Sequence, residues 1–248
     1  MPAVEATGDI AYPTKLVLCR RDTVLTSHGI HSVASRSVIF ENTMKVAIID
    51  FGMGNLRSVE KAFHQVGMDG AFVTNNPAEV ASADKAVLPG DGTFDATMHS
   101  LRRSGTDQIV LEFVRSGRPF LGICVGMQVL LTSSEEGEPG VLGLNLVPGR
   151  VRRFPVGAGL KVPQIGWNTL EFAPDSPLGA DLPGTSPMAY FLNSYYCVPD
   201  DSGDAAATTE YGLPFCSALH RGNIWATQFH PEKSGPVGLA ILRNFAKL

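Results

Sequence analysis

Glycines stand two residues before and two residues after Cys124, in the segment Gly122-Ile123-Cys124-Val125-Gly126. This segment ends an apolar run, Pro119–Cys124, that is typical of a buried parallel strand. The residues that follow, Val125–Ser133, have the spacing of a helix. A nucleophile on such a sharp strand-to-helix turn needs glycine neighbours, because their missing Cβ atoms leave room for strained backbone. This cysteine elbow restricts the chain to folds in which the strands of an open sheet lead directly into helices.

Short strands and helices alternate around the cysteine elbow. Predicted strands are Val46–Asp50, Ala71–Thr74 and Ala86–Leu88, and predicted helices are Leu56–Val66 and Thr106–Arg115. Later strands are predicted at Leu144–Val151, Asn168–Phe172, Met188–Val198, Ala206–Tyr211 and Ile224–Phe229, with a closing helix at Ile241–Phe245. We therefore predict the α/β class, with an open, mostly parallel sheet, helices on both faces and a strand-rich C-terminal half.

Residues 1–43 differ in character from the rest of the chain. Acidic and basic side chains balance there, and no apolar segment of signal-peptide length follows a basic start. We expect a poorly ordered N-terminal extension that precedes a natural start at Met44. Residues 44–248 form one domain in this interpretation, because neither a linker nor an internal repeat divides them.

Composition excludes several kinds of partner and compartment. The formal net charge is −4 and the sequence has no Lys/Arg run, so we expect no nucleic-acid partner. The longest apolar stretch, Phe120–Leu131, is too short to span a bilayer, so we expect no membrane partner. The four cysteines form no C-x-x-C pair, which argues against a disulfide framework or a structural zinc site. A reducing, cytoplasmic setting fits such a chain.

His230 and Glu232 are the candidate partners of the Cys124 thiol. A thiol nucleophile needs a base, and the base needs a group that orients it. His230 follows an apolar run, and Pro231 holds it in an extended conformation, so Glu232 is predicted to lie behind the imidazole ring and accept its second N–H. Two rivals are a plain His–Glu surface pair and a zinc site, since all three residue types bind zinc. The elbow serves nucleophilic attack better than metal binding.

The other cysteines and histidines are interpreted as structural or surface residues. Cys19, Cys197 and Cys216 lack the glycine flanks and are expected to be buried and inert. The remaining histidines are expected at the surface or the edge of the core; they are His28, His31, His64, His99 and His220.

Backbone N–H groups near Cys124 are candidate stabilisers of a developing oxyanion. The first amides of the helix after the elbow favour a thiolate, and the N–H of Val125 is placed to serve as one oxyanion donor. The loop Leu88–Phe94 follows a strand and contains Pro89-Gly90-Asp91-Gly92. We expect this loop to supply the second oxyanion donor, near Gly92. An ordinary turn is the alternative for this loop. Gly52-Met53-Gly54 is not a dinucleotide fingerprint, because Arg57 stands where the third glycine would fall.

Taken together, these motifs resemble the class I glutamine amidotransferases. The motifs are GICVGMQ at the elbow, QFHPEKS (Gln228–Ser234) and the PGDG loop. Three more stretches resemble the glutaminase subunit of imidazole glycerol phosphate synthase: DFGMGNLRSV (Asp50–Val59), KVPQIGWN (Lys161–Asn168) and YFLNSYY (Tyr190–Tyr196). The resemblance runs from about Met44 to the C-terminus and implies a flavodoxin-like class I glutaminase fold.

This resemblance implies a reaction and a partner. Cys124 would attack the side-chain amide of glutamine, form a thioester and release ammonia, while His230 moves protons with Glu232 behind it. Gln128 and the backbone of Ser194 and Tyr195 would hold the glutamine. Ammonia would pass to a separate (β/α)8-barrel cyclase that makes imidazole glycerol phosphate and aminoimidazole carboxamide ribotide in histidine biosynthesis. No metal or organic cofactor is implied.

The sequence departs from the family pattern at three positions. Asp91 stands where the family usually has a small apolar residue, and Gln164 and Asn193 stand where it usually has histidines. These changes leave open how the oxyanion loop is set and how activity follows the partner. Three alternatives therefore stay beside the histidine-pathway enzyme: an amidotransferase subunit for another acceptor such as a surface sugar, a catalytically silent regulatory subunit, and a cysteine peptidase or γ-glutamyl hydrolase.

Overall fold

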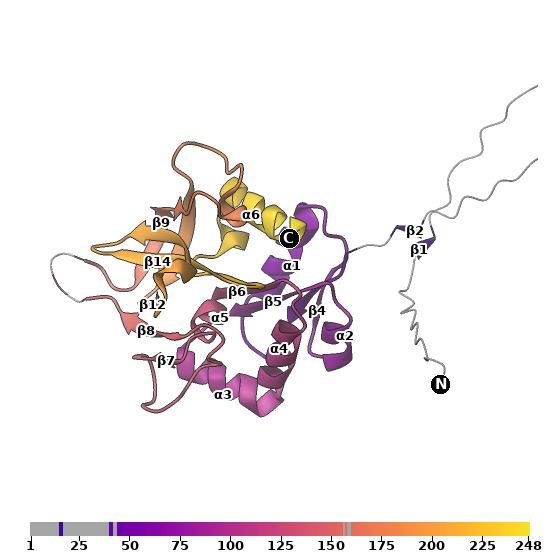
Figure 1. Ribbon diagram of the computed structural model, residues 1–248, viewed down its shortest axis with the longest axis horizontal. Coiled ribbons are helices and arrows are strands. Elements are labelled where there is room, and N and C mark those ends of the chain that lie inside the picture. Colours follow the sequence, from indigo (N-terminus) through magenta and orange to yellow (C-terminus); the bar gives the residue numbers. More distant parts are fainter. Residues whose placement is uncertain (1–14, 17–39, 42–43, 156, 158–159) are drawn as a thin grey trace, which may run out of the picture. The chain divides into compact units, whose positions relative to one another are not determined.

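The computed structural model describes residues 15–16, 40–41, 44–155, 157 and 160–248 (Figure 1). The chain divides into two units, Met1–Thr43 and Met44–Leu248. In the first unit, β1 (Lys15–Leu16) pairs antiparallel with β2 (Phe40–Glu41). The prediction that residues 1–43 form a poorly ordered extension falls almost wholly outside the described residues, and it stays a prediction.

Five parallel strands form one half of the main sheet in the second unit. In order along the sheet they are β4 (Ala71–Thr74), β3 (Val46–Ile49), β5 (Lys85–Gly90), β6 (Phe120–Cys124) and β15 (Ile224–Thr227). Numbered along the chain, this is the 2-1-3-4-5 order of flavodoxin-like folds. The strands are fully or largely buried because helices cover both faces, which explains their continuous apolar sequences. The predicted α/β class with a mostly parallel sheet is confirmed.

Helices cover the two faces of this parallel half (Figure 1). On one face α1 (Leu56–Gln65) packs against α6 (Gly235–Lys247), and the rings of Phe63 and Phe245 meet edge to face at 6.3 Å. On the other face lie α2 (Pro77–Ala81), α3 (Phe94–Ser104), α4 (Thr106–Arg115) and the short α5 (Val125–Gln128). The sequence sets the helix starts: the side chains of Asn55 and Thr93 accept hydrogen bonds from N–H groups in the first turns of α1 and α3.

The strand-rich second half continues the sheet with antiparallel strands. The strand β14 (Pro214–Arg221) pairs with β15, and beyond it lie β12 (Tyr195–Pro199), β8 (Gly149–Arg153) and β7 (Ser133–Ser134). A branch adds β13 (Ala205–Glu210) and β10 (Glu171–Phe172). A separate two-stranded sheet pairs β9 (Gln164–Thr169) with β11 (Met188–Asn193). Short 3-10 turns are η1 (Pro177–Gly179), η2 (Ser202–Asp204) and η3 (Pro231–Lys233).

Several predicted elements have other bounds in the structure. The helix predicted over Val125–Ser133 is wrong in length, because α5 ends at Gln128 and the carbonyls of residues 129–132 bond to the loop at residues 143–147. The strand expected to stop at Leu88 continues to Gly90, where it pairs with Cys124. The strand predicted over Leu144–Val151 is instead mostly loop, and the one over Met188–Val198 is interrupted at Ser194.

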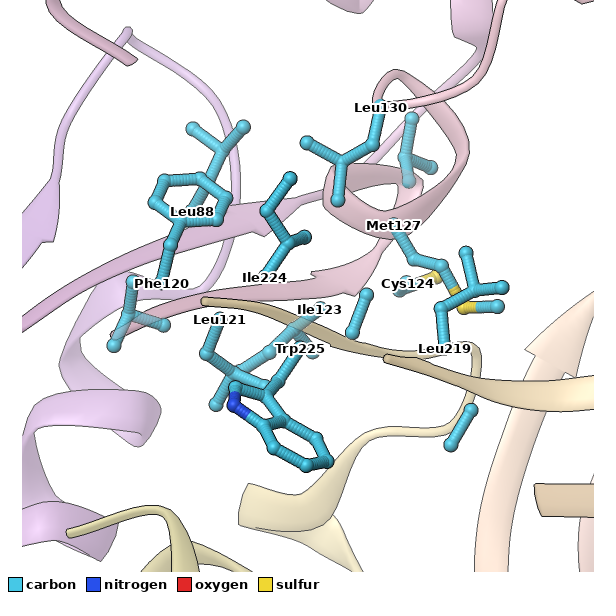
Figure 2. Packing of buried hydrophobic residues seen from close by; sticks show 14 of the residues in the cluster. Leu88, Phe120, Leu121, Ile123, Cys124, Met127, Leu130, Leu219, Ile224 and Trp225 are labelled. Atoms are coloured by element: carbon cyan, nitrogen blue, oxygen red, sulfur yellow. The ribbon is translucent and has the colours of Figure 1, made fainter. Parts of the chain in front are cut away.

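The elbow lies inside the main apolar core. Figure 2 shows Cys124 and Ile123 among side chains from α5, β14 and β15, including Met127, Leu219 and Trp225. Packing on both faces of β6 therefore holds the strand end that carries Cys124. Within the described residues, none of the helices has both the length and the apolar character that a membrane crossing demands.

Candidate functional site

The backbone of Cys124 has the strained conformation that the elbow motif predicts. Its φ is 57° and its ψ is −114°, a region that side-chain-bearing residues rarely adopt. A Cβ atom on Gly126 would lie 1.9 Å from the carbonyl oxygen of Leu88, and one on Gly122 would lie 2.6 Å from that of Gly126. Both glycines are therefore required by close backbone approach, as predicted.

Cys124, His230 and Glu232 lie together. The Nδ1 atom of His230 is 2.9 Å from Oε1 of Glu232, and the side chains of both residues are almost buried. The Cys124 side chain is close enough to this ring to raise its pKa. Burial by itself lowers the pKa of His230, but the hydrogen bonds and negative charges of Cys124 and Glu232 outweigh it and raise the pKa to about 10. The site therefore favours the imidazolium form of His230 at neutral pH.

The His–Glu contact forms in a different local conformation from the one predicted. Residues Pro231–Lys233 make the 3-10 turn η3, so His230 and Glu232 do not belong to one extended segment. Ser234 fixes this turn because its Oγ donates to the carbonyl of His230 at 2.6 Å and accepts from the N–H of Tyr190 at 2.9 Å. The Oε2 atom of Glu232 is buried and has no hydrogen-bond partner among the described residues.

The two expected oxyanion donors differ in their surroundings. Val125 begins α5, so its N–H is one of the first amides of a helix, which find no acceptor within the helix itself. The N–H of Gly92 donates to Oδ1 of Asp91 at 2.8 Å. Pairing of β5 with β6 as far as Gly90 and Cys124 brings this loop beside the nucleophile. Gly92 can stabilise an oxyanion only after the Asp91 carboxylate releases its N–H.

Behind the sulfur lies a chain of buried amides that we call the amide relay: Gln228, Gln128 and Asn193. Nε2 of Gln228 lies 3.9 Å from Sγ of Cys124, and Oε1 of Gln228 accepts from Nε2 of Gln128 at 3.0 Å. Gln128 and Asn193 both donate to the carbonyl of Tyr195, at 3.3 and 3.0 Å. Gln228 is fully buried, and sequence reasoning missed it. Its position two residues before His230 was the available signal.

Of the expected glutamine-binding residues, Gln128 belongs to this relay, and Ser194 and Tyr195 lie beside it. Both N–H bonds of the Gln128 side chain are directed to protein acceptors, which leaves its Oε1 as the atom that can face a ligand. The carbonyl of Ser194 accepts from the N–H of Phe154, and that of Tyr195 accepts from the relay.

The second unit of the chain matches known proteins along almost its whole length. The model of the family described as "Glutamine amidotransferase class-I" matches residues 47–248. The protein named imidazole glycerol phosphate synthase subunit HisH in Syntrophotalea carbinolica is 51% identical over 208 residues, which are 82% of this chain and 100% of the relative. The chain belongs to the class-I glutamine amidotransferase family.

Other relatives are similar to this chain over nearly the same length. HisH of Geobacter sulfurreducens is 51% identical, and the match covers 82% of this chain and 99% of the relative. HisH of Deinococcus radiodurans is 49% identical, with coverage of 82% and 93%.

Solved structures support the same fold. One titled as a glutamine amidotransferase has a TM-score of 0.63 at 19% identity and covers 82% of this chain and 99% of its own. A glutamine amidotransferase from Thermotoga maritima has a TM-score of 0.57 at 16% identity, with coverage of 83% and 97%.

Two of the departures from the amidotransferase pattern face each other. Gln164 and Asn193 are register partners across β9 and β11, and both are buried. Oε1 of Gln164 and Oδ1 of Asn193 have no hydrogen-bond partner in the part of the chain that the structure describes. The third departure, Asp91, is exposed on the oxyanion loop.

A small hollow opens beside His230 in this amidotransferase. Its volume is about 40 Å³, enough for a few water-sized molecules and too small for glutamine. Its lining residues are Asn55, Val59, Pro89, Gly90, Asp91, Ile123, Leu192, His230, Glu232 and Lys233.

Those of the remaining cysteines and histidines that the structure describes lie where the sequence predicts. Cys197 and Cys216 are buried, and burial raises the pKa of the Cys197 thiol well above its usual range and that of Cys216 to about 12. His64 and His99 are exposed and His220 is half-buried. Cys19, His28 and His31 lie outside the described residues. Across the described ranges, no three or more His, Cys, Asp or Glu side chains are grouped as a metal site would need.

Proposed function

We propose that this chain is the glutaminase subunit of imidazole glycerol phosphate synthase, which supplies ammonia to a partner cyclase in histidine biosynthesis. The observation that carries the proposal is the arrangement of Cys124, His230 and Glu232 on a glycine-flanked elbow. The names of relatives that are about half identical over nearly their full length favour the histidine pathway over another acceptor.

In this mechanism the Cys124 thiolate attacks the amide carbon of the glutamine side chain. Because Glu232 occupies Nδ1 of His230, Nε2 is the ring atom that faces the sulfur. The imidazolium gives its proton to the departing nitrogen, the carbon–nitrogen bond breaks, and ammonia leaves a thioester on Cys124. His230 then takes a proton from water, which attacks the thioester and releases glutamate and the thiolate.

Backbone amides stabilise the oxyanion in both steps. The N–H of Val125 is the first donor, and the N–H of Gly92 becomes the second when the Asp91 carboxylate gives it up. Oε1 of Gln128 and the Ser194–Tyr195 segment bind the substrate's amino-acid end. In this proposal, the conformation of the oxyanion loop determines the rate of glutamine hydrolysis.

We assign the outer surface of the β9–β11 sheet as the docking face for the cyclase, a (β/α)8 barrel in this proposal. Register pairing places Ile165 opposite Leu192 and Trp167 opposite Tyr190, with Met188 at the end. Ile165, Trp167, Met188 and Leu192 are exposed by 40 to 62%, and a contiguous apolar patch of this kind marks an interaction surface.

The docking face connects directly to the site. The carbonyl of Tyr190 accepts from the N–H of His230 at 3.0 Å, and Leu192 lines the hollow beside His230. Ammonia fits this hollow, so we propose that it leaves toward the partner on this side. The free thiols of Cys124, Cys197 and Cys216 suit the reducing cytoplasm, where we place the complex.

The test compares glutamine hydrolysis by the full chain alone and with its cyclase and the cyclase's nucleotide substrate. We expect a low rate alone and strong stimulation in the complex. Ile165→Asp on the docking face should weaken the complex by at least about tenfold, because charge is placed on a desolvated apolar contact. Leu142→Asp, at another exposed apolar residue outside the face, should leave it unchanged. Equal rates with and without the cyclase would refute the coupling.

A further inference from the structure

Gln228 contacts the reacting sulfur, and the mechanism above gives it no role. It directly follows β15, whose last residue Thr227 pairs with Ile123 on β6, so the next pair in register is Gln228 beside Cys124. Its backbone N–H donates to the carbonyl of Ser217 at 2.9 Å, which fixes the main chain at this point. The side chain is fully buried and reaches the sulfur from within the protein.

The direction of the hydrogen bonds in the amide relay follows from one backbone carbonyl. The carbonyl of Tyr195 can only accept, so the Gln128 atom beside it must be the donor Nε2. That same Nε2 contacts Gln228, so the Gln228 atom it meets must be the acceptor Oε1. The remaining end of the Gln228 amide, Nε2, therefore faces Sγ of Cys124 with an N–H.

We propose that Gln228 is a further catalytic residue whose side-chain N–H stabilises the Cys124 thiolate. A hydrogen bond to an anion is stronger than one to a neutral thiol, so the N–H favours the charged form of the nucleophile. Burial of both groups removes competing water and strengthens the effect. Gln128 holds the side-chain amide of Gln228 in place by a hydrogen bond. Glutamine bound at Gln128 would therefore affect the same amide group whose N–H faces the Cys124 sulfur. The proposal rests on the function proposed above and deepens it.

The test measures thiolate formation rather than turnover. The rate of Cys124 alkylation by iodoacetamide is followed against pH in the full-length chain, with Cys124→Ala as the background. In Gln228→Met, which keeps the shape of the side chain and removes the N–H, we expect the midpoint to move up by about one pH unit. The titratable groups facing Cys124 are His230, with Glu232 behind it, and the Cys197 thiol, and none of them changes in this variant.

Asn244→Leu is the matched control. Asn244 is a buried amide on α6 that donates to the carbonyls of Leu178 and Ala180, so its loss removes buried hydrogen bonds away from the sulfur. We expect its alkylation midpoint to equal that of the wild type. An unmoved midpoint in folded Gln228→Met, or an equal shift in Asn244→Leu, would overturn the proposal.

A second measurement needs no variant at Gln228. In the wild type, the side-chain amide proton resonances of Gln228 should shift with the same midpoint as the alkylation of Cys124, while those of Asn244 stay fixed. Amide proton resonances of Gln228 that do not shift at this midpoint would also overturn the proposal. Glutamine hydrolysis that persists in Cys124→Ala would instead refute the proposed function, so the two failures are distinguishable.

Discussion

At the scale of single residues, His230 links the charges of the site. Its ring lies between Glu232 and the Cys124 sulfur in a nearly water-free position. Cys124 and Glu232 together raise the pKa of the ring to about 10, so the proton stays on it at neutral pH. The protonated state prepares the leaving-group proton before glutamine arrives.

Replacing Glu232 with Gln should lower the pKa of His230 from about 10 toward its ordinary value of 6.5, because one of the two negative charges that raise it is lost. NMR titration of the ring measures this change. A raised native pKa stabilises the folded state fully below pH 6.5, and this contribution is lost as the pH rises toward 10. Wild type should therefore lose more unfolding free energy than Glu232→Gln across that range. An unchanged ring pKa would contradict the assigned pairing.

The side chain of Asp91 accepts the N–H of Gly92, which we propose as the second oxyanion donor. Asp91→Ala frees the N–H of Gly92 and removes a negative charge beside the site, so the isolated chain should hydrolyse glutamine about tenfold faster. Asp91→Asn is the matched control, since its side-chain oxygen can still accept the same N–H and should keep the rate low. Steady-state glutamate release measures both variants, and a slower Asp91→Ala enzyme would disprove this role.

The sequence predicted the reactive residues of the site better than the residues that contact and position them. Cys124 and His230 carry recognisable chemistry in recognisable contexts, so both could be selected before any coordinates. Gln228 carries no chemistry that a motif reveals, and only the contact with the sulfur identifies it. The hydrogen bond from the N–H of Gly92 to the side chain of Asp91 depends on side-chain orientation in a loop, which residue types alone do not determine.

At the scale of secondary structure, the end of β6 and the start of α5 position the nucleophile. Gly90, Gly122 and Gly126 let β5, β6 and α5 approach so closely that Cβ atoms would overlap with backbone. Because α5 is only four residues long, its first N–H groups affect Cys124 more than a helix dipole does.

Gly126→Ala should destabilise the protein by about 3 kcal/mol, because the new methyl group would overlap the carbonyl oxygen of Leu88 within the core. Urea denaturation measures the loss. Gly203→Ala, in the exposed turn η2 where the nearest atom is a flexible carboxylate oxygen, should cost far less. A similar loss of unfolding free energy in both variants would show that the backbone around Gly126 is not rigid.

The strands of the parallel half were predictable because burial on both faces makes them continuous apolar runs. The strand-rich half was less predictable, since β8, β9 and β11 mix buried and exposed residues and the strand ends depend on pairing partners distant in sequence. The buried strand β14 was not predicted. Ser194 interrupts the predicted strand Met188–Val198 because β11 and β12 belong to different sheets. That division is a tertiary property with no local signal.

At the scale of the whole molecule, the two sheets meet at the site and give it two sides. The main sheet carries Cys124, while the β9–β11 sheet carries Asn193 of the relay, holds the loop of His230 through Tyr190 and presents the proposed docking face outward. A partner on that face would lie next to the hollow beside His230. In the proposed complex, a few backbone hydrogen bonds would couple docking to the chemistry of the site.

The most direct test replaces Cys124 with Ala in the complex with the cyclase and compares the two nitrogen sources. Glutamine-dependent glutamate release should disappear, because no other nucleophile stands on the elbow, while synthesis driven by added ammonium salt should continue at the wild-type rate. Glutamate release at the wild-type rate from the Cys124→Ala complex would contradict the account.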